Sequence, residues 1–156
     1  MKVPALALKL IRAFEGLHKV RPDGQIEAYA DPAHGWRVPT IGVGATGPDV
    51  QRGTVWTRAE CDRRLERDAE KFAAGVAKAS PAIPADPPRH AALTSFAFNL
   101  GLAAYQGSTL RRKVNERDWP EAGRQCRRWT KAGGITLPGL VIRREAEAAL
   151  LEGGGP

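Results

Sequence analysis

The chain has 156 residues, of which 42% are apolar and 26% are charged. This length supports one domain with its own core, and the balance excludes an intrinsically disordered chain. The formal charge of +7 favours polyanionic partners such as nucleic acid, anionic membranes or bacterial cell walls, without choosing among them. Cys61 and Cys126 fit no metal-binding spacing, so we expect neither a metal site nor a cofactor. The sequence leaves open whether these two cysteines pair.

The first predicted element is a helix that begins at Pro4. Apolar residues recur at helical spacing as far as Phe14, and the pattern ends near Leu17. Lysine and arginine interrupt this stretch, so it does not have the form of a secretory signal. No run of the chain reaches the ~18 apolar residues of a membrane span. We therefore expect a soluble chain made in the cytoplasm, with no stable membrane insertion.

Residues 18–50 differ in character, because glycine and proline recur throughout them. Pro22-Asp23-Gly24 predicts a turn, since proline fixes φ and glycine tolerates positive φ. We expect short strands over residues 25–30 and 38–43. Together they predict a small sheet near the N-terminus.

From Thr57 onward the pattern is helical. Thr57 and Glu60 have the spacing of a capping box, which predicts the start of a helix that runs to about Lys78. A proline-rich connector follows, and further helices are expected over 89–100, 109–115, 119–129 and 138–151. This order predicts an α+β fold in a single domain, 1–156. In this predicted fold, an N-terminal helix and small sheet (about 1–56) are joined by a linking helix (about 57–79) to a helical lobe (about 86–151).

Glu15 is the first candidate for chemistry. It lies at the end of an apolar helix face, where the helix meets the glycine-rich region. Cleavage of a glycosidic bond commonly uses two carboxyl groups, one as general acid and one to activate water or attack the sugar. The acid needs an apolar setting that keeps it protonated near neutral pH. Taken alone, Glu15 fits this role and also fits a solvated glutamate at a helix end.

Three short motifs occur around Glu15 in a fixed order: Phe14-Glu15-Gly16, Tyr29-Ala30-Asp31-Pro32 and Thr40-Ile41-Gly42-Val43-Gly44. They resemble the F-E-G, Y-x-D and T-I-G-x-G motifs of phage-type lysozymes, the endolysins of glycoside hydrolase family 24. The resemblance implies a lysozyme-like fold and a catalytic set of Glu15, Asp31 and Thr40. Within this set, Glu15 would be the general acid, while Asp31 and Thr40 would hold the attacking water.

The resemblance continues downstream. Residues 95–101 are similar to the family's S-F-x-F-N-x-G helix, residues 108–110 to its S-T-L, and residues 129–144 to its closing segment. It implies substrate contacts at Phe98 and Ser108, and an arginine of the last helix, Arg143 or Arg144, beside the catalytic glutamate. Trp36, which lies in a loop, is a further candidate to stack on a sugar.

The sequence departs from the family pattern between the motifs. Residues 16–30 separate Glu15 from Asp31, several more than the family has, so Asp23 and Glu27 remain alternatives for the second carboxylate. The turn after Asp31 is also expanded and includes His34 and Trp36. As a lone histidine in a loop, His34 is expected to face solvent.

The resemblance implies a monomeric muramidase that hydrolyses the β-1,4 bond between N-acetylmuramic acid and N-acetylglucosamine in peptidoglycan and so lyses the host cell. It implies accumulation in the host cytoplasm, export with a holin partner, and action on the cell wall in the periplasm. Two alternatives stay open. One is a lytic transglycosylase, which cuts the same bond with one glutamate. The other is a non-catalytic basic domain that binds cell wall or nucleic acid, although we find no nucleic-acid-binding motif.

Overall fold

The computed structural model describes residues 2–154, which form two compact units. The β unit comprises Glu15–Asp68, and the helical unit comprises the chain up to Phe14 and from Ala69 onward. The first helix, α1 (Ala5–Glu15), therefore belongs to the helical unit except for its last residue. The long helix α2 (Arg58–Ala79) contributes residues to both units.

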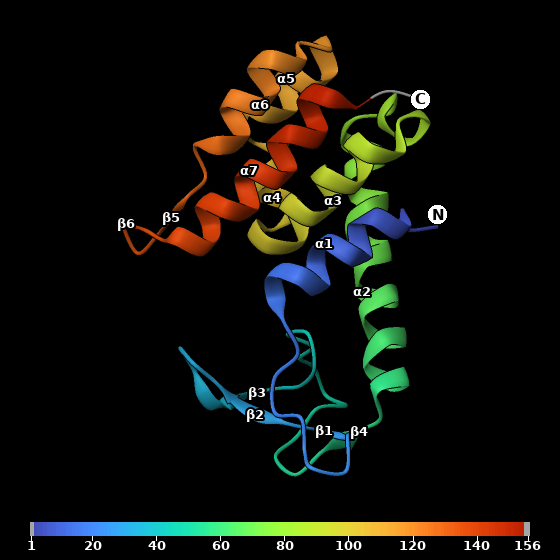
Figure 1. Cartoon of the computed structure of the whole chain (residues 1–156), viewed down its shortest axis with the longest axis vertical. Coiled ribbons are helices and arrows are strands. Elements are labelled where there is room, and N and C mark those ends of the chain that lie inside the picture. Colours follow the sequence, from blue (N-terminus) through green and yellow to red (C-terminus); the bar gives the residue numbers. More distant parts are fainter. Residues whose placement is uncertain (1, 155–156) are drawn as a thin grey trace. The chain divides into compact units, whose positions relative to one another are not determined.

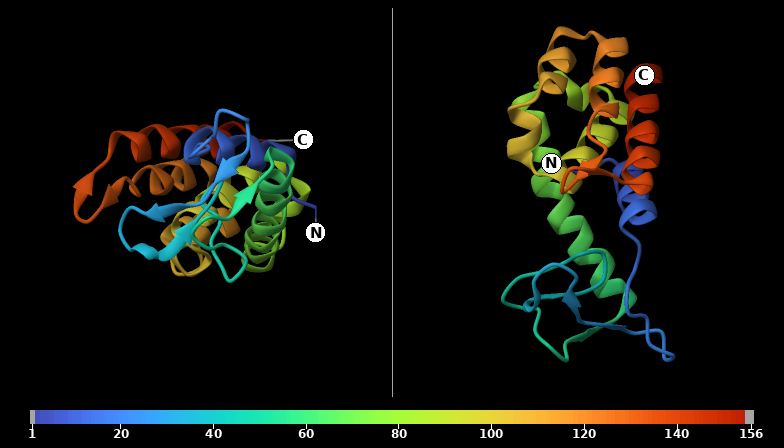
Figure 2. Two further views of the ribbon diagram at one scale, coloured as in Figure 1. Left: turned by 90° about the horizontal axis from the view of Figure 1, so that it is seen from below. Right: turned by 90° about the vertical axis from the view of Figure 1, so that its left-hand side faces the viewer.

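The β unit contains two antiparallel pairs of short strands. β1 (Ile26–Glu27) pairs with β4 (Val55–Trp56), and β2 (Tyr29–Asp31) pairs with β3 (Gly35–Thr40), as Figures 1 and 2 show. The strand expected over 25–30 is thus divided around Ala28. The strand expected over 38–43 lies earlier, because Ile41 and Ala45 bond to each other in a tight turn. β4 was not predicted.

Buried side chains of the β unit form a small core of their own: Ile26, Ala28, Ile41, Ala45, Val50 and Cys61. Gly42 lies against this core with φ +62°, and a Cβ there would be 3.0 Å from the Cys61 sulfur. Only glycine meets both demands without strain. The predicted capping box is confirmed, since the Glu60 backbone N–H donates to Thr57 Oγ1 and the Thr57 N–H donates to Glu60 Oε2.

The helical unit is built from short helices after α2. They are the 3₁₀ helix η1 (Ile83–Ala85) and α3 (Pro87–Leu100), α4 (Leu102–Gln106), α5 (Thr109–Glu116), α6 (Trp119–Arg127) and α7 (Pro138–Gly153). The hairpin of β5 (Lys131–Ala132) and β6 (Ile135–Thr136) joins α6 to α7 (Figure 1). The predicted helices are confirmed with small shifts at their ends. α4 and this hairpin were not predicted.

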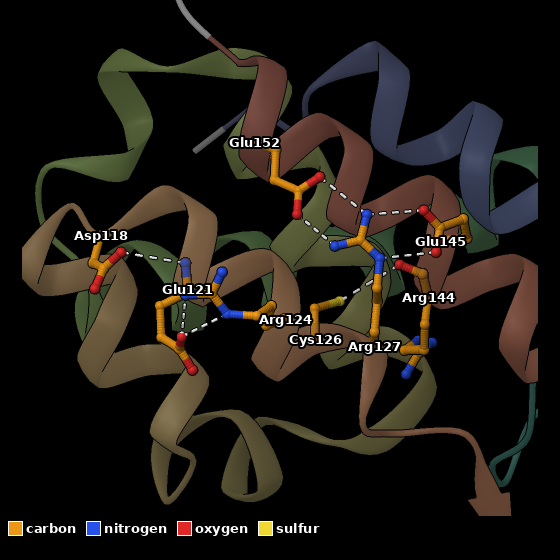
Figure 3. A network of polar contacts seen from close by, with 8 residues as sticks. All are labelled: Asp118, Glu121, Arg124, Cys126, Arg127, Arg144, Glu145 and Glu152. Atoms are coloured by element: carbon orange, nitrogen blue, oxygen red, sulfur yellow. Dashed lines mark hydrogen bonds and ion pairs between the residues drawn. The ribbon is translucent and has the colours of Figure 1, made fainter.

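The core of the helical unit surrounds α3, whose residues from Arg89 to Ala97 are all buried. Phe96 packs edge-on against Tyr105 and Trp129. On the outside, Arg127 of α6 bonds Glu145 and Glu152 of α7 (Figure 3). Both cysteines are buried, and they form no disulfide with each other. Within residues 2–154, no helix is both long and apolar enough to cross a membrane.

Candidate active site

Glu15 closes α1 and opens the β unit. Gly16 follows it with φ +71°, the left-handed conformation that commonly ends a helix. His18 then turns back, and its Nε2–H donates to the Glu15 backbone carbonyl over 3.1 Å. The Glu15 side chain is half-buried. The helix end and the histidine thus fix the backbone from which the carboxyl group projects.

Asp31 is held by its own turn. Its Oδ1 accepts hydrogen bonds from the Ala33 N–H (2.9 Å), the His34 N–H (2.8 Å) and His34 Nδ1–H (2.9 Å). Hydrogen bonds from the His34 backbone and imidazole, followed by that from Ala33, lower the pKa of the Asp31 carboxyl. All three bonds use Oδ1, so Oδ2 remains available to a water molecule. Asp31 is therefore suited to act as a base.

Tyr29 connects the three predicted catalytic residues. It lies directly opposite Thr40 in the β2–β3 pair, and it precedes Asp31 by two positions on the same strand. Burial raises the pKa of the Tyr29 hydroxyl, and the negative charges of Asp31 and Glu15 raise it further. Both carboxylates are thus close enough to influence one phenol. Tyr29 thus lies opposite Thr40 in the sheet and within electrostatic reach of the Asp31 and Glu15 carboxylates.

Thr40 is buried at the end of β3. Its hydroxyl donates to the Val38 carbonyl over 3.1 Å, which leaves the oxygen lone pairs as acceptors. A water molecule beside Thr40 could therefore donate one proton to Oγ1 while a carboxylate receives the other. This is the arrangement needed to orient a nucleophilic water.

The two alternatives for the second carboxylate have other surroundings. Asp23 is exposed, and its Oδ1 accepts the Gln25 N–H within the predicted turn. Glu27 is exposed on β1, where its backbone pairs with Val55. The negative charge of Asp31, by contrast, raises the pKa of the Tyr29 hydroxyl.

His34 and His18 are the neighbours that the sequence did not identify. His34 is exposed as expected, with 62% of its side chain accessible, but its ring bonds Asp31. The His18 ring lies 5.4 Å from the Tyr29 ring. A histidine three positions after an aspartate is compatible with such a bond. Spacing alone could not distinguish it from a histidine that faces only solvent.

Trp36 lies in the expanded turn. Ala30 pairs with Pro39 and Asp31 with Gly35, so residues 36–38 form a bulge on β3. Trp36 is 41% exposed, and the Arg52 guanidinium lies 5.0 Å from the centre of its ring. The indole is therefore presented at the surface of the β unit.

The other two predicted substrate contacts belong to the helical unit. Phe98 is half-buried, with its ring 5.2 Å from that of Phe72. Ser108 caps α5, because its Oγ accepts the Arg111 N–H and donates to the Tyr105 carbonyl. Ser108 also lines a cavity of about 360 Å³ with Gln125, Arg128 and Trp129. The helix cap by itself gives Ser108 a structural role.

Arg143 and Arg144 are buried in the helical unit around Glu147. Arg143 Nε donates to Glu147 Oε1 (3.2 Å), and Arg144 Nε lies 2.9 Å from Oε2. Ser95 Oγ also donates to Oε1. Burial raises the pKa of the Glu147 carboxyl, while Arg144, Ser95 and Arg143 oppose that rise. The Arg143 guanidinium further lies over the Phe14 ring, in the last turn of α1. Both arginines are thus buried and not exposed at the surface.

The family model for phage lysozymes matches residues 13–147, most of the chain. The chain belongs to the phage lysozyme family. The α+β fold is lysozyme-like: this phage lysozyme family member has a TM-score of 0.81 with an endolysin from Escherichia coli O157:H7 phage FAHEc1, at 32% identity over 97% of this chain and 93% of that one. It has a TM-score of 0.80 with the muramidase domain of SpmX from Asticcacaulis excentricus. That alignment has 28% identity and covers 96% of this chain and 97% of the muramidase domain.

Among sequences, this family member is 36% identical to the endolysin of Bacillus phage PZA. The alignment covers 100% of this chain and 57% of that endolysin. The chain thus spans little more than half the length of this relative.

Proposed function

We propose that the chain is a muramidase that hydrolyses the β-1,4 bond between N-acetylmuramic acid and N-acetylglucosamine in bacterial peptidoglycan. The observation that carries this proposal is the position of Tyr29, opposite Thr40 and within electrostatic reach of Asp31 and Glu15, with Asp31 Oδ2 left available. The endolysin and muramidase names of the relatives support the same substrate. The cell wall is the proposed place of action.

In the proposed mechanism, Glu15 protonates the oxygen of the leaving sugar. Asp31 remains ionised and accepts a proton from a water molecule that Thr40 helps to orient. That water attacks the anomeric carbon from the opposite face, so the product has the inverted configuration. A β-anomer as the first product would refute this assignment of Asp31.

The remaining predicted residues have supporting roles in the proposal. Trp36, Phe98 and Ser108 contact the glycan. Arg143 lies over Phe14 and steadies the helix end that carries Glu15, while Arg144 holds Glu147 in place. We further propose that the chain acts as a monomer, without a cofactor, and reaches the wall with a holin.

The test is a turbidity assay on purified peptidoglycan with the natural chain, Glu15→Gln and Glu66→Gln. General acid catalysis contributes about 10²–10⁴-fold, so Glu15→Gln should lose activity by that factor. Glu66→Gln, at an exposed glutamate of α2 in the same unit, is the matched control and should keep most activity. A folded Glu15→Gln protein that lyses walls normally would refute the role of Glu15.

Analysis of the products separates hydrolysis from the alternative reaction. Reducing ends are expected from a hydrolase, whereas anhydro-sugar ends would indicate a lytic transglycosylase. Walls that are bound but not cut by the natural chain would instead indicate a non-catalytic binding domain.

A further inference from the structure

A cavity of about 560 Å³ in the β unit contains charged side chains to which the proposed bond cleavage gives no role. The side chains that give it chemical character are Lys19, Glu27, Tyr29, Trp36 and Arg52, and small residues lie between them. Tyr29 also lies opposite Thr40 and two positions before Asp31 on β2. The cavity therefore adjoins the candidate catalytic groups.

The backbone of this cavity is fixed by bonds between distant segments. The Glu27 N–H donates to the Lys19 carbonyl over 3.0 Å, and the Ala28 N–H donates to the Thr54 carbonyl over 2.9 Å. Lys19 has φ +54°, which is uncommon for a residue with a side chain. Lys19 and Arg52, far apart in sequence, are thus brought to one cavity by the fold.

The charges of the cavity are available to a ligand. Within residues 2–154, neither Lys19 nor Arg52 forms an ion pair, and the only side-chain contact found for Arg52 is its stacking on Trp36. Glu27 likewise forms no ion pair in this part of the chain. The cavity thus offers two cations, one carboxylate and a partly exposed indole.

We propose that this cavity binds the stem peptide of peptidoglycan, the short peptide attached to muramic acid, as a substrate-recognition site. The inference rests on the proposed function. Lys19 and Arg52 would bind carboxylates of the peptide, and Glu27 would bind its free amino group. A neutral glycan would leave these charges unused. A polyphosphate would be repelled by Glu27.

The direct test measures binding by titration calorimetry of a soluble stem tripeptide, L-alanyl-γ-D-glutamyl-meso-diaminopimelate, to the full chain. The double variant Lys19→Gln/Arg52→Gln should bind roughly ten-fold more weakly, as expected for the loss of two solvent-exposed ion pairs. The matched control is Arg58→Gln, which removes an exposed charge of the same unit outside the cavity. It should bind normally. No binding by the natural chain at millimolar peptide, or equal binding by the double variant, would overturn the proposal.

Glu27→Gln separates the peptide from an anionic polymer. If Glu27 holds an amino group, this substitution weakens binding of the tripeptide. Tighter binding of both the tripeptide and poly(glycerol phosphate) by Glu27→Gln would instead identify a general anion site and overturn the peptide assignment.

Kinetics provide a readout that a merely structural role would not change. The natural chain should have a lower KM for peptide-bearing strands than for strands from which an amidase has removed the peptides. In the double variant this KM ratio should fall toward one, while thermal unfolding stays the same. If neither the natural chain nor the double variant cleaves strands with or without peptides, the proposed function fails. Calorimetry then still decides whether the cavity binds the peptide.

Discussion

Asp31 and Glu147 are two carboxylates held in contrasting ways. In the β unit, Asp31 takes its hydrogen bonds from residues two and three positions further along the chain. In the helical unit, Glu147 accepts a bond from Ser95, 52 positions away, and lies between two buried arginines. The local arrangement leaves Asp31 accessible for chemistry, whereas the long-range arrangement ties α7 to α3. Substitutions in the two units should accordingly affect different properties.

The largest effect is expected from Asp31→Asn. The amide oxygen can still accept the bonds of the turn, so the fold should persist, but the base is lost and peptidoglycan hydrolysis should fall by about 10²–10⁴-fold. The variant should stay folded, with only a small decrease in thermal stability at neutral pH. Asp23→Asn is the control, because Asp23 also accepts a local backbone bond. If Asp23→Asn is inactive and Asp31→Asn is active, the base has been misassigned.

Glu147→Gln tests the helical unit. It leaves two buried guanidinium groups with no carboxylate between them, which should lower the free energy of unfolding by about 3–5 kcal/mol in urea titrations. Glu145→Gln is the control, since the Glu145 side chain is 60% exposed in its pair with Arg127 (Figure 3). Glu145→Gln should lower the free energy of unfolding by less than about 1 kcal/mol. Equal losses for the two variants would contradict the contrast between buried and exposed pairs.

Salt should separate binding to the wall from the chemical step. The net charge of +7 favours encounter with an anionic wall. Because attraction between exposed charges is screened beyond about 10 Å at 0.1 M ionic strength, lysis of whole walls should fall several-fold toward 0.5 M. Hydrolysis of a short neutral saccharide should change little. Parallel salt curves for the two substrates would show that the charge does not steer binding.

The smallest effect is expected from His34→Ala. Its imidazole bond to Oδ1 lowers the pKa of Asp31, so its loss should move the acid limb of the kcat/KM profile to higher pH. The Ala33 and His34 backbone bonds remain, so activity at neutral pH should stay within about two-fold, since an exposed charged pair contributes little. Arg37→Gln in the same turn is the control. An unmoved acid limb in His34→Ala would rule out this contribution.

A lowered pKa in the folded chain also links Asp31 to stability. The folded state favours the ionised carboxylate. Asp31 therefore contributes to the free energy of unfolding at pH values above the pKa that its carboxyl has in the unfolded chain. This contribution is lost as the pH falls through the lower folded value. Asp31→Asn should therefore flatten the decrease in stability at acid pH.

The sequence by itself determined the features that depend on neighbouring residues. The capping box at Thr57, the helix boundaries and the motifs around Glu15, Asp31 and Thr40 are all short-range patterns. Such patterns can be read locally because each residue's partner lies within a few positions of it. The lysozyme-like α+β fold followed from the order of these elements together with the resemblance to a known family.

Only the tertiary structure decided which distant segments meet. β1 and β4 have two residues each, too few to show any periodicity, and their pairing of Ile26 with Trp56 is set by the fold. The same holds for Lys19 and Arg52 at one cavity and for Arg143 and Arg144 around Glu147. From the sequence alone, a charged residue is predicted to be exposed. The partners that permit its burial come from elements elsewhere in the chain, so only the fold reveals them.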